Sequence, residues 1–240
     1  MFRHTFSGTL LPVSSRALAE LLAVVVPPAC VVCGTALPRA ELWLCVACTR
    51  ALPWLPARTC PRCGLVSHRR GCPAAHSAFA RAWAPLAHDG VARELVAALK
   101  FRGALPVAAL MAAHVAANLP ADLRAGAPAA LVPVPPQAAR ARRRGFDPAG
   151  VLTAAVAPRL GLPVWRCLRR RDRAARQVGS TRSQRRRGGR LAIELRAPPP
   201  PRALLVDDVH TTGATLDACA RALRAGGCGE VVALTYTRTL

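Results

Sequence analysis

The chain has 240 residues, with 34 Lys and Arg against 12 Asp and Glu, which gives a formal net charge of +22. Hydrophobic residues make up 52% of the chain and charged residues 19%, so the composition supplies a folded core and argues against a disordered basic protein. No apolar run approaches the roughly 18 residues of a membrane-spanning helix, and we expect no membrane span.

The N-terminal residues 1–25 are predicted to form an amphipathic lead-in helix. Glu20 interrupts their apolar stretch, and Pro27 and Pro28 stand where small residues would precede a cleavage site, so the segment is a poor signal peptide. We therefore expect a cytoplasmic protein.

Three cysteine pairs with two-residue spacers follow at intervals of 15 residues, namely Cys30 and Cys33, Cys45 and Cys48, and Cys60 and Cys63. A two-residue spacer lets both sulfur atoms of a tight turn bind one metal ion, and two such pairs complete a tetrahedral zinc site. Disulfides are the alternative, but a cytoplasmic location favours zinc. Residues 26–80 are therefore predicted to form a zinc-ribbon module.

If the first two pairs share one zinc ion, the third pair needs two further ligands. Cys72 and His76 are our choice, and His68 is the competing nitrogen ligand. An interleaved arrangement of the three pairs stays open, because spacing alone does not decide it. With every ligand supplied by the protein, both zinc sites would be closed and structural rather than catalytic.

Residues 81–240 show short apolar runs separated by alanine-rich helical stretches, as in a parallel α/β domain. We expect strands near residues 83–88, 130–134, 164–167, 203–206 and 231–236. We expect helices near residues 91–101, 105–119, 148–160 and 214–225. The fold class is therefore α/β, with a parallel sheet flanked by helices behind a small N-terminal zinc-ribbon module.

Positive charge is concentrated in this larger domain. Lys100 is the only lysine of the chain, and 18 arginines lie between Arg140 and Arg202. A polyanion, either a phosphate ester or a nucleic acid, is the partner that this charge indicates. The alternative for any single arginine is a solvated surface position.

The most informative segment is residues 203–215, in which four apolar residues precede Asp207 and Asp208. The carboxylates are expected at the carboxyl end of a parallel strand, where ligands bind in open α/β sheets. The turn behind them directs backbone N–H groups, a helix N-terminus and hydroxyl groups at one phosphate, and it consists of Thr211, Thr212, Gly213, Ala214 and Thr215. A turn that only caps the next helix would not need two adjacent carboxylates and three threonines.

This segment resembles the signature of type I phosphoribosyltransferases. Other motifs resemble the ComF family of competence-associated proteins: residues 99–103, residues 132–135, the arginines that lead into Arg144, Gly145 and Phe146, and the cysteine-rich N-terminus. The resemblance covers about residues 21–239. It implies a type I phosphoribosyltransferase fold, similar to the transferase half of amidophosphoribosyltransferases, and a link to DNA uptake in natural transformation.

The resemblance also implies a role for each motif in binding phosphoribosyl pyrophosphate (PRPP) with Mg²⁺. Asp207 and Asp208 would hold the ribose hydroxyls or the water shell of the metal, the threonine turn would hold the 5′-phosphate, and Val134 and Pro135 would receive the pyrophosphate. Lys100 is a further candidate phosphate contact, with a packed lysine at a helix end as the alternative. A flexible hood over residues 169–187 would close on the donor, and its catalytic residues would be Arg173, Gln177 and Arg185.

The sequence departs from the family pattern at Asp147 and Pro148, where Asn-Gln is usual, and at Ala75, where a cysteine would complete a fourth pair. Thr211 stands where purine-salvage transferases carry an aspartate for a proton of the base, which disfavours a purine base as the acceptor. His210 is expected either to exchange protons or, equally, to face solvent as a loop residue.

Two functions follow as hypotheses. The first is a PRPP-dependent phosphoribosyltransferase with an unidentified acceptor, which the 203–215 segment favours. The second is a non-catalytic accessory protein that binds single-stranded DNA and works with a helicase-like partner, which the net charge of +22 and the ribbon module favour. A bound phosphoribosyl ligand could also regulate such a protein without turnover.

Overall fold

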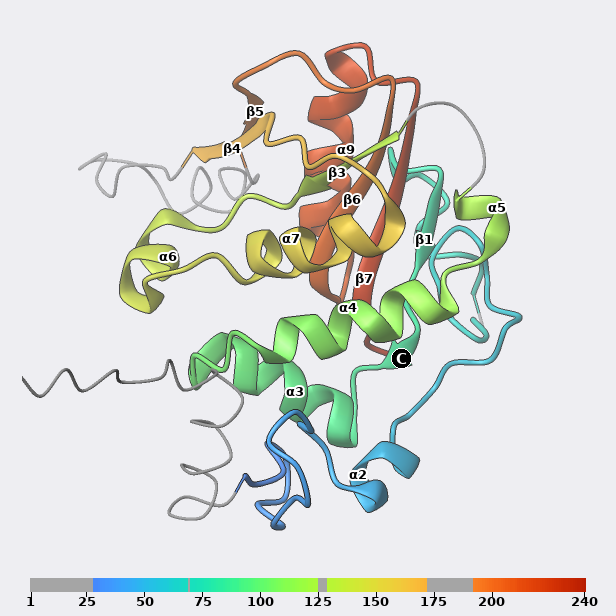
Figure 1. Ribbon diagram of the computed structural model, residues 1–240. Helices are drawn as coiled ribbons and strands as arrows, with labels where there is room; N and C mark the ends of the chain where they lie inside the picture. Colours follow the sequence, from blue (N-terminus) through green and yellow to red (C-terminus); the bar gives the residue numbers. More distant parts are fainter. Residues whose placement is uncertain (1–27, 69, 125–128, 172–191) are drawn as a thin grey trace, which may run out of the picture. The chain divides into compact units, whose positions relative to one another are not determined.

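The computed structural model describes residues 28–68, 70–124, 129–171 and 192–240 (Figure 1). The expected lead-in helix over residues 1–25 lies outside this described part. The chain divides into two compact units, Met1–Arg50 and Ala51–Leu240. The first unit contains the short helix α2 (Val46–Arg50), and the second contains every other described helix and strand. The cysteine-rich residues 26–80, expected as one module, therefore belong partly to each unit.

A parallel sheet forms the centre of the second unit. Its strands are β1 (Arg81–Trp83), β2 (Leu86–Ala87), β3 (Ala129–Pro133), β6 (Arg202–His210) and β7 (Glu230–Arg238). The order across the sheet is β1-β7-β6-β3, with β2 also paired to β7, and all of these pairs are parallel. Strands β6 and β7 are buried along most of their length, which explains their nearly continuous apolar runs.

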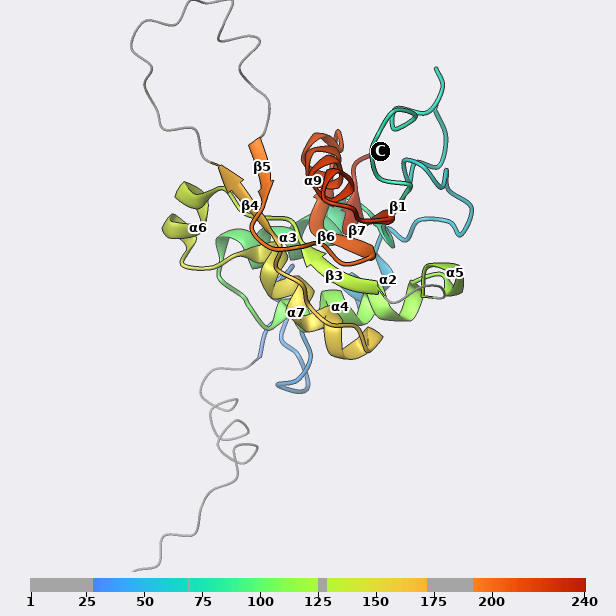
Figure 2. The ribbon, with the colours of Figure 1, turned by 90° about the horizontal axis from the view of Figure 1, so that it is seen from above.

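Helices cover both faces of this sheet. The helices of the second unit are α3 (Gly90–Phe101), α4 (Val107–Asn118), α5 (Ala121–Arg124), α6 (Ala138–Arg144), α7 (Pro148–Leu160) and α9 (Ala214–Ala225). Helix α9 lies on one face, and α7 lies on the other with α4 beside it (Figure 2). The predicted architecture, a parallel sheet flanked by helices, is confirmed. Among the described residues, none of the helices is long and apolar enough to cross a membrane.

Two predicted strands differ from the structure. The strand expected at residues 83–88 is divided into β1 and β2, because Pro85 has no N–H group to donate to the sheet. In the segment expected at 164–167 a single bridge joins Val164 to Leu131. The chain then forms β4 (Leu168–Arg171), which pairs with β5 (Ala192–Leu195) as a separate antiparallel sheet. Three consecutive arginines in β4 suit this exposed hairpin and not a buried parallel sheet.

Candidate functional site

A pocket of about 280 Å³ lies at the carboxyl ends of β3 and β6. It brings together the predicted site residues Lys100, Val134, Pro135, Asp207, Asp208, Thr211 and Thr215. A smaller hollow of about 40 Å³ shares four residues with it and is also lined by the predicted Thr212, Gly213 and Ala214. The predicted hood residues Arg173, Gln177 and Arg185 lie outside the described part of the chain.

The two adjacent carboxylates at the end of β6 have different surroundings. Asp208 is buried, and its Oδ1 lies 2.7 Å from the Nζ atom of Lys100. Asp207 lines both hollows, and its Oδ1 accepts a hydrogen bond of 2.9 Å from the backbone N–H of Asp208. Burial and the charge of Asp208 raise the pKa of Asp207 well above its usual range. Lys100, predicted to contact phosphate, lines the pocket and forms an ion pair with one of the two carboxylates.

The turn from β6 to α9 surrounds the smaller hollow. Gly213 precedes α9 with φ +79°, a left-handed conformation that favours glycine, and the Thr212 hydroxyl accepts a hydrogen bond of 3.4 Å from the N–H of Ala214. The first N–H groups of a helix have no partners within the helix, so the start of α9 presents donors at this hollow. A helix N-terminus with hydroxyl groups beside it suits a phosphate group.

His210 lies beneath this turn instead of facing solvent. It is the last residue of β6, is 3% exposed, and has the ring of Phe79 edge-on at a centroid distance of 6.0 Å. Burial lowers the pKa of His210 to about 4, with a smaller contribution from Arg238, so the ring is neutral at physiological pH. The expectation of a solvent-facing loop residue was wrong, because β6 continues past the acidic pair and carries His210 into the core.

The flank of the pocket near α6 contains polar residues that we did not assign to the site from the sequence. Gln137, Arg144, Asp147 and Arg170 line it together with Arg140. Among the described residues, Arg144 Nε and Asp147 Oδ1 are buried without a hydrogen-bond partner. The sequence does contain a signal for this flank. The basic run that forms α6 begins a few residues after Val134 and Pro135, which were predicted to receive the pyrophosphate.

Four cysteines of the first unit, Cys30, Cys33, Cys45 and Cys48, form a metal-binding group, with all sulfur atoms within 4.8 Å of one another. Cys33 Sγ and Cys45 Sγ are 3.6 Å apart, close to the roughly 3.8 Å between two thiolates on a tetrahedral zinc ion. A hydrogen bond with Thr35 lowers the pKa of Cys33 to about 6, which favours the thiolate that zinc binds. The first two cysteine pairs therefore share one site and are not interleaved with the third.

The second group lies in the second unit and consists of Cys60, Cys63, His68 and Cys72. Cys60 Sγ and Cys72 Sγ are 3.8 Å apart, and three sulfurs with one imidazole are a usual ligand set for structural zinc. The nitrogen ligand of this group is His68, and the prediction of His76 as that ligand was wrong. His76 is exposed and outside this group, in a turn whose carbonyl groups at Ala74, Ala75 and Ser77, with that of Ala80, accept hydrogen bonds from the guanidinium of Arg62.

These positions predict different effects for the two histidines. His68→Ala should accelerate zinc release from the second group at least roughly tenfold, because only three protein ligands remain. His76→Ala should release zinc as the unchanged chain does, since His76 is exposed and outside both groups. Metal analysis and the rate of zinc transfer to a chelator measure this. Faster release from the His76 variant alone would contradict the assignment.

Comparison with known proteins identifies part of this arrangement. Residues 21–80 match the model of the double zinc ribbon domain. No curated protein matches the chain. A solved structure described as the allosteric regulatory enzyme of purine biosynthesis is similar over 53% of this chain and 25% of its own, with 20% identity and a TM-score of 0.34. The chain thus spans about a quarter of that protein's length. The present chain contains a double zinc ribbon, with two groups suited to structural zinc, and a parallel α/β sheet flanked by helices.

Proposed function

We propose that this protein is a phosphoribosyltransferase that binds PRPP with Mg²⁺ in the pocket at the carboxyl ends of β3 and β6. The observation that supports this most directly is the position of Asp207, which lines both the main pocket and the hollow of the threonine turn. A ligand with a phosphate in the turn would therefore place its neighbouring sugar beside carboxylates. A 5-phosphoribosyl group has this combination of a phosphate and adjacent hydroxyl groups.

Each part of the donor has chemically suitable residues in the pocket. The start of α9 and Thr211, Thr212 and Thr215 offer hydrogen-bond donors to the 5′-phosphate. Asp207 and Asp208 supply the hard oxygen atoms that suit ribose hydroxyls or hydrated Mg²⁺. When bound, the metal ion would neutralise charge on the pyrophosphate. The turn at Val134 and the basic flank of the pocket are suited to the pyrophosphate itself.

The reaction would be a displacement at C1 of the ribose. A lone pair of the acceptor forms the new bond to C1, the bond from C1 to the pyrophosphate oxygen breaks, and pyrophosphate leaves with that electron pair. Positive side chains close to the leaving group favour this step, because charge develops on pyrophosphate as the bond breaks. The pocket offers Arg140, Arg144 and Arg170 for this purpose. The ComF resemblance adds a proposed role in DNA uptake.

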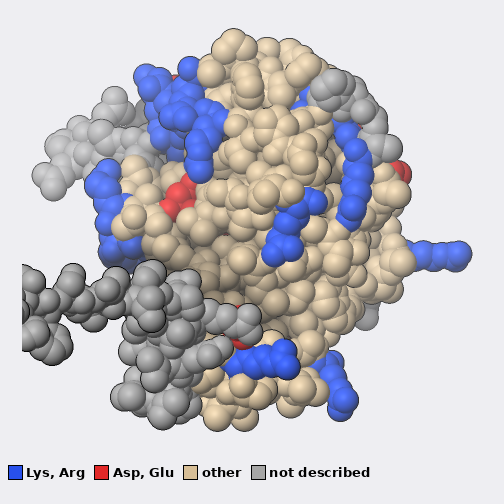
Figure 3. Space-filling model, viewed as in Figure 1, with Lys and Arg blue, Asp and Glu red and all other residues tan. Residues whose placement is uncertain are grey.

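A second candidate is binding of single-stranded DNA without catalysis. Basic side chains gather over α6 and over the β4–β5 hairpin on the face seen in Figure 3. Helix α6 has four arginines in seven residues and none of its residues is buried, and β4 adds three more arginines. Such exposed charge provides affinity for phosphate backbones that weakens steeply with salt. This observation favours a nucleic-acid surface beside the pocket.

Calorimetric titration of the zinc-loaded chain with PRPP and Mg²⁺, after removal of nucleic acid, tests the proposal. We expect a dissociation constant in the roughly micromolar range, which Asp207→Asn with Asp208→Asn should abolish. Asp122→Asn, an exposed carboxylate in α5, is the control and should bind normally. No binding by the folded chain would reject the phosphoribosyl site. If the double variant loses PRPP but keeps single-stranded DNA, the two ligands use separate sites.

A further inference from the structure

Arg238, near the C-terminal end of β7, is a buried guanidinium whose partners belong to two different functional segments. It is 5% exposed, and the hydrogen bonds that it donates within the described part of the chain go to backbone carbonyl groups. Its Nε donates to Cys63 O at 2.9 Å, and its Nη1 donates to His210 O at 2.9 Å and to Thr211 O at 2.5 Å. A third contact of Nη1 reaches Thr239 O at 2.8 Å.

The first of these partners is part of the second metal group. Cys63 is fully buried and belongs to the set Cys60, Cys63, His68 and Cys72. Its carbonyl orientation depends on the tight turn of its pair, in which the N–H of Gly64 donates to Cys60 O at 2.8 Å. A metal ion that holds the two sulfurs together would therefore also fix the carbonyl that Arg238 contacts.

Two of the other partners, His210 and Thr211, lie at the start of the threonine turn that surrounds the smaller hollow. His210 and Thr211 directly precede Thr212 and Gly213, so their carbonyl groups set the direction in which the turn leaves β6. A guanidinium is planar and its donors have fixed relative directions. A shift of the Cys63 carbonyl would therefore be transmitted to the first peptide groups of the turn.

Two further contacts connect the same regions. The segment that follows Cys72 places the N–H of Ala78 2.7 Å from Asp217 Oδ1, in the first turn of α9, and the Phe79 ring against His210. Cys63 and Phe79 also pack in one core cluster with Leu216 of α9. The second metal group and the phosphate turn thus share both polar and apolar contacts within one unit.

We propose that Arg238 is a positioning residue that couples the second metal group to the phosphate turn, so that zinc at this group strengthens phosphate binding. This inference rests on the proposed function, because it assigns a regulator to the same phosphate hollow. Coupling between two binding sites is reciprocal. Bound phosphate should therefore retain zinc in the second group by the same factor by which zinc tightens phosphate. The first group lies in the other unit and should not respond.

The experiment measures both directions of this coupling in the full chain with inorganic phosphate as the probe. Calorimetry gives the phosphate affinity of the zinc-loaded chain and of His68→Ala with Cys72→Ser, which leaves the second group only two of its four ligands and is checked by metal analysis for loss of its zinc. Zinc affinity of the second group is measured by chelator competition with and without phosphate, in a Cys33→Ser, Cys45→Ser background that lacks the first site. We expect a factor of about 5 or more in both directions.

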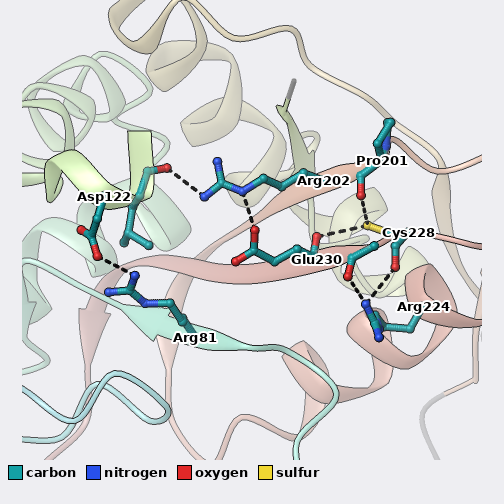
Figure 4. A network of polar contacts seen from close by, with 9 residues as sticks. Arg81, Asp122, Pro201, Arg202, Arg224, Cys228 and Glu230 are labelled. Carbon is teal, nitrogen blue, oxygen red and sulfur yellow. Dashed lines mark hydrogen bonds and ion pairs between the residues drawn. The ribbon is translucent and has the colours of Figure 1, made fainter. Parts of the chain in front are cut away.

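Arg238→Lys separates positioning from general stability, because lysine keeps the charge but cannot donate in a planar fork. This variant should still bind zinc and phosphate, with the coupling factor reduced to about one. Arg202→Lys is the matched control. Arg202 is the first residue of β6 and is also 5% exposed. Its guanidinium donates hydrogen bonds to Glu230 and to the carbonyl oxygen of Leu123 (Figure 4), at the opposite end of β6 from the threonine turn. The Arg202→Lys variant should keep the coupling factor of the unchanged chain, even where it lowers the stability of the fold.

The outcomes distinguish this inference from the proposed function. A zinc-loaded chain that binds no phosphate contradicts the proposed function and the coupling with it. Phosphate binding that is equal with and without zinc in the second group overturns the coupling alone. Full coupling in Arg238→Lys overturns the positioning role of Arg238. If Arg238→Lys does not fold, the reciprocal measurements on the unchanged arginine still decide whether the two sites are coupled.

Discussion

Replacement of Lys100 by methionine is expected to lower the free energy of unfolding by about 2–4 kcal/mol, because it leaves the buried Asp208 without its cation. Lys100 Nζ and Asp208 Oδ1 are 2.7 Å apart, and the two side chains are 22% and 7% exposed. Methionine preserves most of the aliphatic stem, so the loss reports the ion pair more than packing. Burial and the charge of Asp208 already raise the pKa of Asp207, the preceding residue, so the charge on Asp208 is the one that Lys100 compensates.

An exposed ion pair of similar length provides the control. Arg81 Nη1 lies 2.6 Å from Asp122 Oδ2, but these side chains are 35% and 58% exposed (Figure 4). Arg81→Met should therefore change stability far less, because water screens the pair. Urea unfolding of the zinc-loaded variants measures the difference. Lys100→Met with Asp208→Asn should recover about half of the loss, since no unpaired carboxylate remains at position 208. Equal effects of Lys100→Met and Arg81→Met would show that burial adds nothing to the Lys100 pair.

The elements that the sequence predicts well are those whose pattern has one physical explanation. Continuous apolar runs, as in β6 and β7, fit strands that are buried on both faces of a parallel sheet. The interrupted edge of the sheet and the β4–β5 hairpin were predicted less well. Their form depends on Pro85 and on exposed arginines, whose effects are settled by the neighbouring strand and not by local propensity.

The candidate site, too, was predicted only where the residues lie close together in the sequence. Spacing was enough to group the paired cysteines and to bring the 203–215 segment to a strand end. It could not choose His68 over His76, because both lie four residues from Cys72 and only the folded chain shows which imidazole reaches the sulfur atoms. Likewise, Lys100 meets Asp208 only in the folded chain, and no local pattern shows that Arg238 would contact both Cys63 and the phosphate turn.

The turn itself gives the other large expected effect. Gly213→Ala should destabilise the protein by about 2–3 kcal/mol and weaken phosphate binding at least roughly tenfold. The residue has φ +79°, which alanine rarely adopts, and a Cβ atom there would lie 2.8 Å from Nε2 of His210. Because His210 is buried beneath the turn, it cannot move aside into solvent. The strain would therefore displace the start of α9, whose N–H groups face the hollow.

Gly161→Ala separates backbone strain from this contact. Gly161 follows the last residue of α7 with φ +65°, and a Cβ atom there would meet no heavy atom of the described residues within 4 Å. It should cost about 1 kcal/mol through its backbone alone and leave phosphate binding unchanged. In Gly213→Ala, the further change His210→Ala removes the close contact and should restore part of the phosphate affinity. If Gly213→Ala binds phosphate as tightly as Gly161→Ala, the phosphate does not depend on this turn, and the 5′-phosphate has to be placed elsewhere in the pocket.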